Sequence, residues 1–257
     1  MDGDGWVEYA LYGAPGELPA FPDGEVEVAG VRVRVRGEPV AEDWAERWKR
    51  FHKPVLVEAA DMRAATAPRR PALVARRPAT PALWVRPPWA EPRSGATDLV
   101  IDPGQAFGTG AHPTTRLCLE LLLGIEPRGS LADLGCGSGV LAIAAAKLGF
   151  APVIAVDSEA AALEATRANA RANGVDLDRV ERLNLREQPP PPAAVVTANL
   201  TRPLLLRMAE LITAPPGALI VSGLLESEAG EGAAAFAPLR ERRRLRAEGW
   251  SALLLTG

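Results

Sequence analysis

From Thr114 onward, short apolar segments alternate regularly with segments of helical periodicity. Short apolar runs predict buried strands, and longer segments in which apolar residues recur every three or four positions predict helices. Strands are expected at 130–134, 152–157, 180–183, 193–199, 217–223 and 250–255, with 242–248 paired to the last, and helices at 114–123, 140–149, 159–173, 203–212 and 227–237. Such alternation predicts a doubly wound α/β fold, with a mostly parallel seven-stranded sheet covered on both faces.

The chain before residue 98 follows a different pattern. Residues 1–40 predict short strands and turns, since valines alternate with charged residues in VEVAGVRVRVRG. A helix is expected over 41–53, a long loop over 58–82, and short strands in ALWVRPPW and DLVIDPG. We therefore expect a small α+β N-terminal domain (1–40), a helical linker with an inserted loop (41–97), and a catalytic domain (98–257).

Composition argues against several classes of protein. The net charge of −3 gives no indication of nucleic-acid or membrane-surface binding, so the basic run RERRRLR is interpreted as a solvated face. No apolar stretch approaches the ~20 residues that span a bilayer, and the start MDGDGW does not resemble a signal peptide. Cys118, Cys136, His52 and His112 lack the spacing of a metal site. We expect a soluble, cytoplasmic protein without a metal ion.

The segment DLGCGSGVLAIAAA is the strongest local motif. A predicted strand ends near Asp133, and glycines at 135, 137 and 139 turn the chain directly into a helix. Glycine permits this tight bend and the close approach of a ligand, which open α/β sheets bind at this edge. The G-x-G-x-G spacing differs from the G-x-G-x-x-G of dinucleotide-binding folds. This spacing favours a ligand without pyrophosphate, such as S-adenosylmethionine. Asp133 can attract the ammonium group of that ligand, either directly or through water. The alternative is a glycine-rich turn with a purely structural role.

Polar residues end the neighbouring predicted strands. Asp157 follows VIAV at the spacing where a carboxylate accepts from ribose hydroxyls, although it can instead cap the next helix, a role that Ser158 can also fill. Asn199 ends AAVVTAN, where its carbonyl can accept from an amine and aim the amine's lone pair at a methyl donor; capping the following helix is the alternative. Asn184 is interpreted either as a neighbour of an adenine ring or as a turn residue.

The segment IDPGQAFGTGAHPTTR combines several glycines and threonines with one phenylalanine, directly before a helix. Such a loop can fold over a bound cofactor, with Phe107 excluding water. Thr114 or Thr115 can then cap the helix or hydrogen-bond the ligand. A plain connecting loop would hardly need this much glycine beside an apolar side chain.

These motifs resemble the PrmA family of ribosomal protein L11 methyltransferases. The resemblance rests on IDPGQAFGTGAHPTTRLCLELL, LADLGCGSGVLAIAAAKLG, AVDSEAAALEATRANARANGV and TANL, which occur in the family's order. The GTG-x-H-x-TT stretch is more diagnostic than the glycine loop. AEDWAERWKRFHKP and ALWVRPPW are similar to the family's linker region. The resemblance thus covers about Asp98 to Leu200 closely.

The resemblance implies a Rossmann-like class I methyltransferase that moves methyl groups from S-adenosylmethionine to lysine and N-terminal α-amines. S-adenosylhomocysteine would be the second product, and a large-subunit ribosomal protein the partner. The family pattern implies cofactor contacts at Thr115, Gly135, Asp157 and Asn199, with Phe107 and Gly108 in a loop over the cofactor. From the motif itself we add Asp133 and Gly137 as cofactor-binding residues, and we assign the catalytic role to Asn199.

The chain departs from the family in two places. The region before Ala41 is short, so the recognition domain is expected to be truncated, and 58–82 is expected to be an insertion. Both lie where the substrate would be chosen. A class I methyltransferase acting on another protein, an RNA or a small molecule therefore stays an alternative, as do a dinucleotide-dependent oxidoreductase and a non-catalytic module.

Overall fold

The computed structural model describes residues 24–28, 31–35, 52–59, 82–103, 108 and 110–257, and the chain divides into two compact units, Met1–Trp48 and Lys49–Gly257. The first contains an antiparallel hairpin of β1 (Gly24–Val28) and β2 (Val31–Val35), in agreement with the predicted alternation. Of the helix predicted over 41–53, only His52 and Lys53 are described, and they form neither helix nor strand. Most of the predicted insertion lies outside the described residues.

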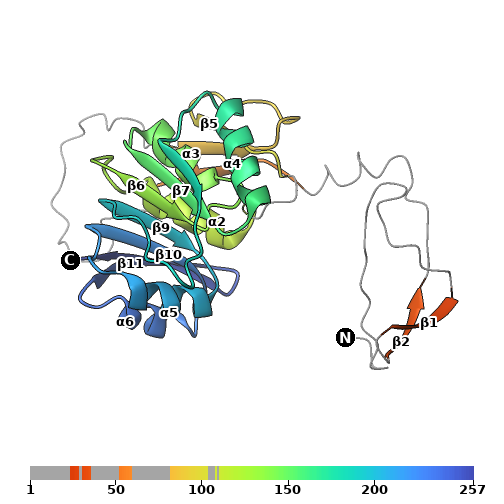
Figure 1. Ribbon diagram of the computed structural model, residues 1–257. Helices are drawn as coiled ribbons and strands as arrows, with labels where there is room; N and C mark the ends of the chain where they lie inside the picture. Colours follow the sequence, from red (N-terminus) through yellow and green to blue (C-terminus); the bar gives the residue numbers. More distant parts are fainter. Residues whose placement is uncertain (1–23, 29–30, 36–51, 60–81, 104–107, 109) are drawn as a thin grey trace. The chain divides into compact units, whose positions relative to one another are not determined.

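The second unit is built on a seven-stranded sheet (Figure 1). Its strands are β6 (Leu131–Leu134), β7 (Val153–Asp157), β8 (Arg179–Arg182), β9 (Val195–Asn199), β10 (Ala218–Leu225), β11 (Arg240–Ala247) and β12 (Trp250–Thr256), in the order β11-β12-β10-β9-β6-β7-β8. The pairs among β10, β9, β6, β7 and β8 are parallel, whereas β12 is antiparallel to both β10 and β11. The predicted doubly wound, mostly parallel sheet is confirmed, including the pairing of its last two strands.

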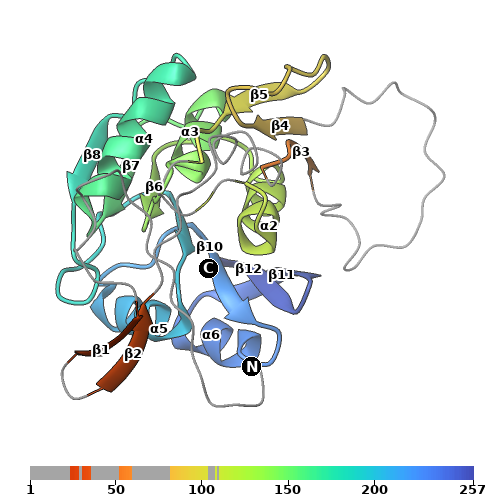
Figure 2. The same ribbon diagram turned by 90° about the vertical axis from the view of Figure 1, so that its right-hand side faces the viewer.

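Helices cover both faces of this sheet (Figures 1 and 2). One face carries α2 (Pro113–Leu122), α3 (Val140–Leu148) and α4 (Ala160–Ala172), and the other carries α5 (Arg202–Leu211) and α6 (Ala229–Ala235). Each face has its own apolar core, because side chains on successive strand residues point to opposite sides. Leu131 packs with α2 and α3, whereas Leu134 packs with Leu205 and Met208 of α5.

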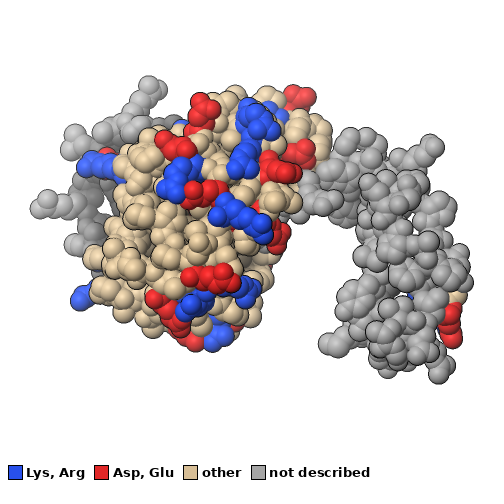
Figure 3. Space-filling model, viewed as in Figure 1, with Lys and Arg blue, Asp and Glu red and all other residues tan. Residues whose placement is uncertain are grey.

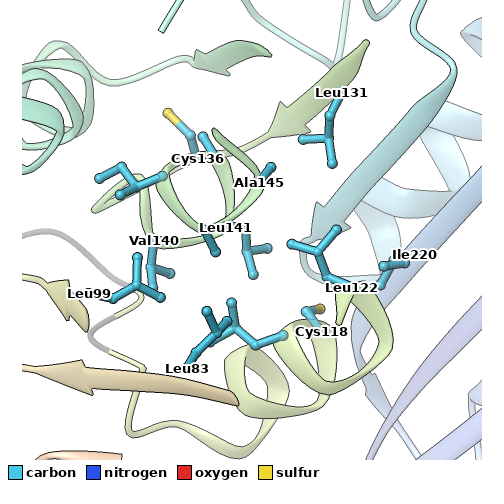
Figure 4. Close-up of a cluster of buried hydrophobic side chains, with 14 of the residues drawn as sticks. Leu83, Leu99, Cys118, Leu122, Leu131, Cys136, Val140, Leu141, Ala145 and Ile220 are labelled. Atoms are coloured by element: carbon cyan, nitrogen blue, oxygen red, sulfur yellow. The ribbon is translucent and has the colours of Figure 1, made fainter. Parts of the chain in front are cut away.

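A smaller sheet adds to the first of these cores. Its strands are β3 (Val55–Glu58), β4 (Ala82–Arg86) and β5 (Thr97–Val100), so the predicted domain boundary at residue 98 falls within β5. Leu83 and Leu99 pack against Cys118 of α2 and Val140 of α3 (Figure 4). Arg86 of β4 also forms a two-pronged ion pair with Asp98, at 2.8 and 2.7 Å. The small sheet therefore shares a core with the helices that border the main sheet.

The start of α4 differs from the expectation. The N-cap is Glu159 rather than Ser158, and it makes no side-chain capping bond. Asp157 Oδ1 instead accepts from the Glu159 amide at 3.0 Å. The helix ends as predicted, with Asn173 as the C-cap and Gly174 at φ +63°, a left-handed conformation that glycine adopts without steric cost.

Candidate functional site

A cavity of about 640 Å³, a typical size for a small-molecule site, lies at the carboxyl edge of the main sheet. It is lined by His112, Thr114, Gly135, Gly137, Asp157, Ser158, Glu159, Ala161, Ala162, Leu183, Asn184, Leu185, Arg186, Asn199, Leu200, Thr201, Leu204, Gly223 and Trp250. These residues include the ends of β7 and β9 and the loop between β6 and α3. Ligands bind at this edge in open α/β sheets.

The glycine loop forms one wall of the cavity and is held by its own backbone. The amides of Gly135 and Cys136 donate to the Val156 carbonyl at 2.8 and 3.0 Å, and the Gly137 amide donates to Asp157 Oδ2 at 3.0 Å. A Cβ on Gly135, which has φ +70°, would lie 2.3 Å from Leu200 Cδ2. The loop amides are thus already bonded within the protein, whereas a pyrophosphate site needs amides that point at the ligand.

Asp157 lines the cavity at the end of β7 and holds two backbone segments. Oδ2 accepts from Gly137 and Oδ1 accepts from Glu159. Asp157 thus satisfies an amide at the start of α4, in line with the capping alternative, and it faces the cavity, where ribose binding stays a prediction. A carboxylate offers about four acceptor positions, so two remain for a ligand's hydroxyls.

Asp133 lies behind the glycine loop. Its side chain is 1% exposed, and it accepts from the Thr197 hydroxyl at 2.8 Å and from the Ala142 amide at 3.1 Å. Ala142 is in the first turn of α3, so Asp133 satisfies an amide that the helix leaves open. Burial is the main cause that raises the pKa of Asp133 to about 7. The predicted attraction for a ligand's ammonium stays a prediction, and it would act across the loop rather than by contact.

Asn199 lines the cavity at the end of β9, and its amide nitrogen is bonded within the protein. Nδ2 donates to the hydroxyls of Thr114 at 3.2 Å and of Thr115 at 3.3 Å. Helix α5 is capped by Thr201 instead, so Asn199 does not serve as its cap. Thr114 lines the cavity, whereas Thr115, the predicted ligand contact, is 1% exposed and lies behind it. The carbonyl of Asn199 is the amide atom left to face a bound molecule.

Hydrogen bonds from two asparagines of the α4 region connect the chain around the end of β5 to the glycine loop. Asn173 bonds both backbone groups of Val100, and Asn169 Oδ1 accepts from the Asp102 amide. Asn169 also donates to the Ser138 carbonyl, and the Ser138 hydroxyl donates to the Gly108 carbonyl at 2.6 Å.

Gly108 has φ +98° and contacts Ser138 behind the glycine loop. Phe107 lies outside the described residues, so its predicted position over the cofactor stays a prediction, as does that of Gly108.

The lining residues that were not assigned to a ligand site from the sequence include His112, Gly223 and Trp250. Gly223 occupies a bulge in β10, with φ +87°, and a Cβ there would lie 2.1 Å from the Leu200 carbonyl oxygen. An isolated glycine within a buried strand is the sequence signal that could have identified it. His112 and Trp250 are far apart in sequence, but their rings meet edge to face at 5.4 Å.

Asn184 forms the hydrogen bond expected of a turn residue, and its place beside an adenine ring stays a prediction. It lines the cavity beyond β8, and its Oδ1 accepts from the Arg186 amide at 3.1 Å, as a turn asparagine does. The Nδ2 group of Asn184 is therefore the side-chain amide group that could donate to a ligand at this end of the cavity.

Neither a metal centre nor a reactive thiol is found in the described part of the chain. No group of three or more His, Cys, Asp or Glu side chains there is arranged to hold a metal ion, and no described helix is long and apolar enough to cross a membrane. Cys118 and Cys136 are buried, and desolvation raises the pKa of both thiols, that of Cys136 to about 12. The side chains that line the cavity carry amide, hydroxyl, carboxyl, guanidinium, aromatic and aliphatic groups.

The family profile "Ribosomal protein L11 methyltransferase (PrmA)" matches residues 77–256. A protein of that name from Azotobacter vinelandii is 44% identical over 179 residues, 65% of this chain and 60% of that protein. One from Alteromonas mediterranea is 37% identical over 241 residues, 83% of this chain and 74% of the relative.

Among solved structures, a ribosomal protein L11 methylase from Lactobacillus delbrueckii subsp. bulgaricus is similar, with a TM-score of 0.61 and 28% identity. The match covers 68% of this chain and 94% of that one. The match to the Azotobacter relative spans only about three fifths of that protein's length.

Proposed function

Since the chain belongs to the ribosomal protein L11 methyltransferase (PrmA) family, we propose that it transfers methyl groups from S-adenosylmethionine to amino nitrogens of a ribosomal protein. One juxtaposition carries this proposal. The ends of β7 and β9 bring a carboxylate, Asp157, and an amide carbonyl, that of Asn199, to the same cavity beside a glycine loop. The first suits a ribose and the second suits an amine.

The cavity suits S-adenosylmethionine better than a dinucleotide. The amides of Gly135, Cys136 and Gly137 are bonded to protein acceptors, so they do not offer a pyrophosphate cradle. A nucleoside without phosphate needs no such cradle. Asp157 would hold its ribose through charge-assisted hydrogen bonds, and Gly135 and Gly137 would let it lie against the loop.

In the proposed reaction the protein orients the acceptor amine and excludes water from it. S-adenosylmethionine, when bound, supplies an electrophilic methyl group on a sulfonium. Asn199 Oδ1 would accept an N–H of the incoming amine and so direct its lone pair. Leu200, Leu204 and Trp250 line the surrounding wall and would exclude water from the amine.

The acceptor must reach this wall as a neutral amine. A lysine has a pKa near ~10.4, and a poorly hydrated site lowers it. His112 is the imidazole in the lining, but its Nδ1 is engaged by Thr114. We therefore propose that the amine loses its proton to water before transfer, without a general base from the protein.

Ribosomal protein L11 is the proposed partner, because the relatives and the matched crystal structure carry its name. Lysine and N-terminal α-amines are the proposed acceptors, and residues 1–40 the proposed recognition domain, with activity in the cytoplasm. On the described part of the face in Figure 3, basic and acidic side chains are interspersed, unlike the basic stripe typical of RNA binding. The described part of this face therefore gives no indication of RNA binding.

The test combines binding with transfer. Calorimetry of the intact chain should detect saturable S-adenosylhomocysteine binding. Radiolabelled S-adenosylmethionine should then label purified ribosomal protein L11, and peptide mapping should locate the label on amines. Binding together with label on RNA alone would refute the substrate, and an absence of binding would refute the whole proposal.

A further inference from the structure

A chain of hydrogen bonds runs from the aromatic wall of the cavity to Asn199. His112 is the N-cap of α2, and its Nδ1 accepts from the Thr114 amide at 3.3 Å and lies 2.8 Å from Thr114 Oγ1. Thr114 Oγ1 in turn accepts from Asn199 Nδ2. The chain joins a helix N-terminus to the end of β9, 85 residues further along the sequence.

The directions of these bonds follow from one another. As the N-cap, Nδ1 accepts from the Thr114 amide, and in this unprotonated state the Thr114 hydroxyl, 2.8 Å away, is its second donor. The Thr114 hydroxyl has only one hydrogen, which it donates to His112. It can therefore only accept a hydrogen bond from Asn199. The amide of Asn199 must therefore present its nitrogen to Thr114 and its carbonyl elsewhere.

We propose that His112 is a positioning residue whose neutral ring, acting through the Thr114 hydroxyl, keeps the carbonyl of Asn199 turned toward the acceptor amine. When His112 is protonated, Nδ1–H donates to Thr114 Oγ1, and the freed hydroxyl hydrogen can donate to Asn199 Oδ1. If the Thr115 hydroxyl, which also accepts from Nδ2, turns to donate as well, the amide can rotate and present its NH₂ group to an amine that needs an acceptor. This inference rests on the proposed function, since it concerns the same amine.

The surroundings keep the ring neutral and in place. Trp250 packs edge to face against it at an interplanar angle of 65°. The charged groups that act on the ring are Glu248, in the turn before β12, and Arg116 of α2, which pair with each other at 2.5 Å. Glu248 raises the pKa of His112 and Arg116 lowers it, but desolvation by burial is the largest effect, and the pKa lies below its ordinary value.

The experiment uses substitutions that separate capping from titration. His112→Asn keeps an acceptor at the N-cap and cannot be protonated, whereas His112→Ala has neither property. His52→Asn is the matched control, since His52 is the only other histidine and does not line the cavity. For each variant, kcat at saturating S-adenosylmethionine and ribosomal protein L11 is measured from about pH 5.5 to about pH 9, together with S-adenosylhomocysteine affinity.

We expect His112→Ala to lower kcat roughly tenfold at about pH 8, with S-adenosylhomocysteine affinity changed less than about twofold. His112→Asn should restore kcat to within about twofold. The ratio of wild-type kcat to that of His112→Asn should be constant above neutral pH and fall as the solution is acidified. This ratio removes the titration of the substrate amine, which both proteins share, and His52→Asn should behave as wild type.

A ratio that stays flat with pH would overturn the inference, even if the alanine variant fails to fold. Equal kcat in wild type and His112→Ala would do the same, as would a loss of S-adenosylhomocysteine affinity in proportion to kcat. A wild-type chain that binds no S-adenosylhomocysteine would instead refute the proposed function, so the two failures are distinguishable.

Discussion

The two ends of the cavity are built in different ways. The end proposed to bind the cofactor, called the cofactor end, consists of Gly135, Gly137 and Asp157. Its hydrogen bonds join residues from one strand–helix–strand unit, such as Gly137 and Asp157, which are 20 positions apart. The end proposed to receive the amine, called the acceptor end, consists of His112, Thr114, Asn199, Gly223 and Trp250. Its contacts join α2, β9, β10 and β12, and the bond between Asn199 and Thr114 spans 85 positions.

This difference separates what each end requires. The cofactor end exists once β6, α3 and β7 are packed, because backbone amides and one carboxylate define it. The acceptor end exists only when β9, β10 and β12 are side by side and α2 is packed near them. We therefore expect substitutions at the cofactor end to change affinity, and substitutions at the acceptor end to change turnover.

Asn199→Ala should have the largest effect on turnover. It removes the carbonyl proposed to orient the amine, so kcat should fall by about a hundredfold. S-adenosylhomocysteine affinity, measured by calorimetry, should change less than about twofold. Thr115→Val, which removes one acceptor of the amide nitrogen, is the graded companion and should lower kcat by a smaller factor. Parallel losses of kcat and affinity in Asn199→Ala would erase the distinction between the two ends.

Asp157→Ala should mainly weaken cofactor binding. Lost charge-assisted hydrogen bonds of roughly 1.5–3 kcal/mol correspond to a Kd for S-adenosylhomocysteine about ten- to a hundredfold higher. Asp178→Ala is the matched control. Asp178 Oδ2 accepts from the Val153 amide at 2.7 Å, at the opposite end of β7 from the cavity. Similar affinity losses in the two variants would show that Asp157 acts only through the stability of the fold.

Gly135→Ala should weaken binding by a smaller factor. An alanine there carries the cost of a left-handed backbone, about 1–2 kcal/mol, and its Cβ would displace the Leu200 side chain. Gly174→Ala at φ +63° carries a similar backbone cost but meets nothing within 4 Å. Chemical denaturation should show a loss of stability for both variants, larger for Gly135→Ala because of the Leu200 contact, and calorimetry should show a loss of affinity only for Gly135→Ala. Equal affinities in the two variants would contradict the close approach of ligand to loop.

Asp133→Asn should affect turnover least and the pH dependence of stability most. The pKa of Asp133 is raised to about 7 in the folded chain, so between about pH 4 and about pH 7 the folded state binds more protons than the unfolded state. The free energy of unfolding should therefore fall as pH rises through this range, and the asparagine variant should lack this contribution. Urea denaturation at several pH values measures it. Identical profiles for the two proteins would show that the buried carboxyl does not titrate in this way.

Sequence reasoning was strongest where the contacts are local. The strands, helices and glycine loop of the main sheet were predicted because their periodicity and turn residues act over short stretches. Asp157 and Asn199 could be brought to one edge since parallel strands end together. The misassigned cap of α4 shows the limit even there, because Ser158 and Asp157 compete for one amide and only their geometry decides.

The acceptor end was less accessible to such reasoning. Nothing in the spacing of His112 and Trp250 indicates that their rings meet, since β12 is brought beside β10 only by the completed sheet. Likewise, the motif left both Thr114 and Thr115 as possible ligand contacts and the family pattern implied Thr115, whereas Thr114 lines the cavity. A helix turns by about 100° per residue, so the rotation of α2 about its axis decides which of two adjacent threonines lines the cavity. That rotation is set by packing, not by local sequence.

A crystal structure of the chain with S-adenosylhomocysteine would test the central claim most directly. We predict the ribose hydroxyls within hydrogen-bonding distance of the Asp157 carboxylate, the nucleoside against Gly135 and Gly137, and the sulfur directed toward Asn199. A ligand bound in the reverse direction, or outside this cavity, would contradict the assignment of the two ends.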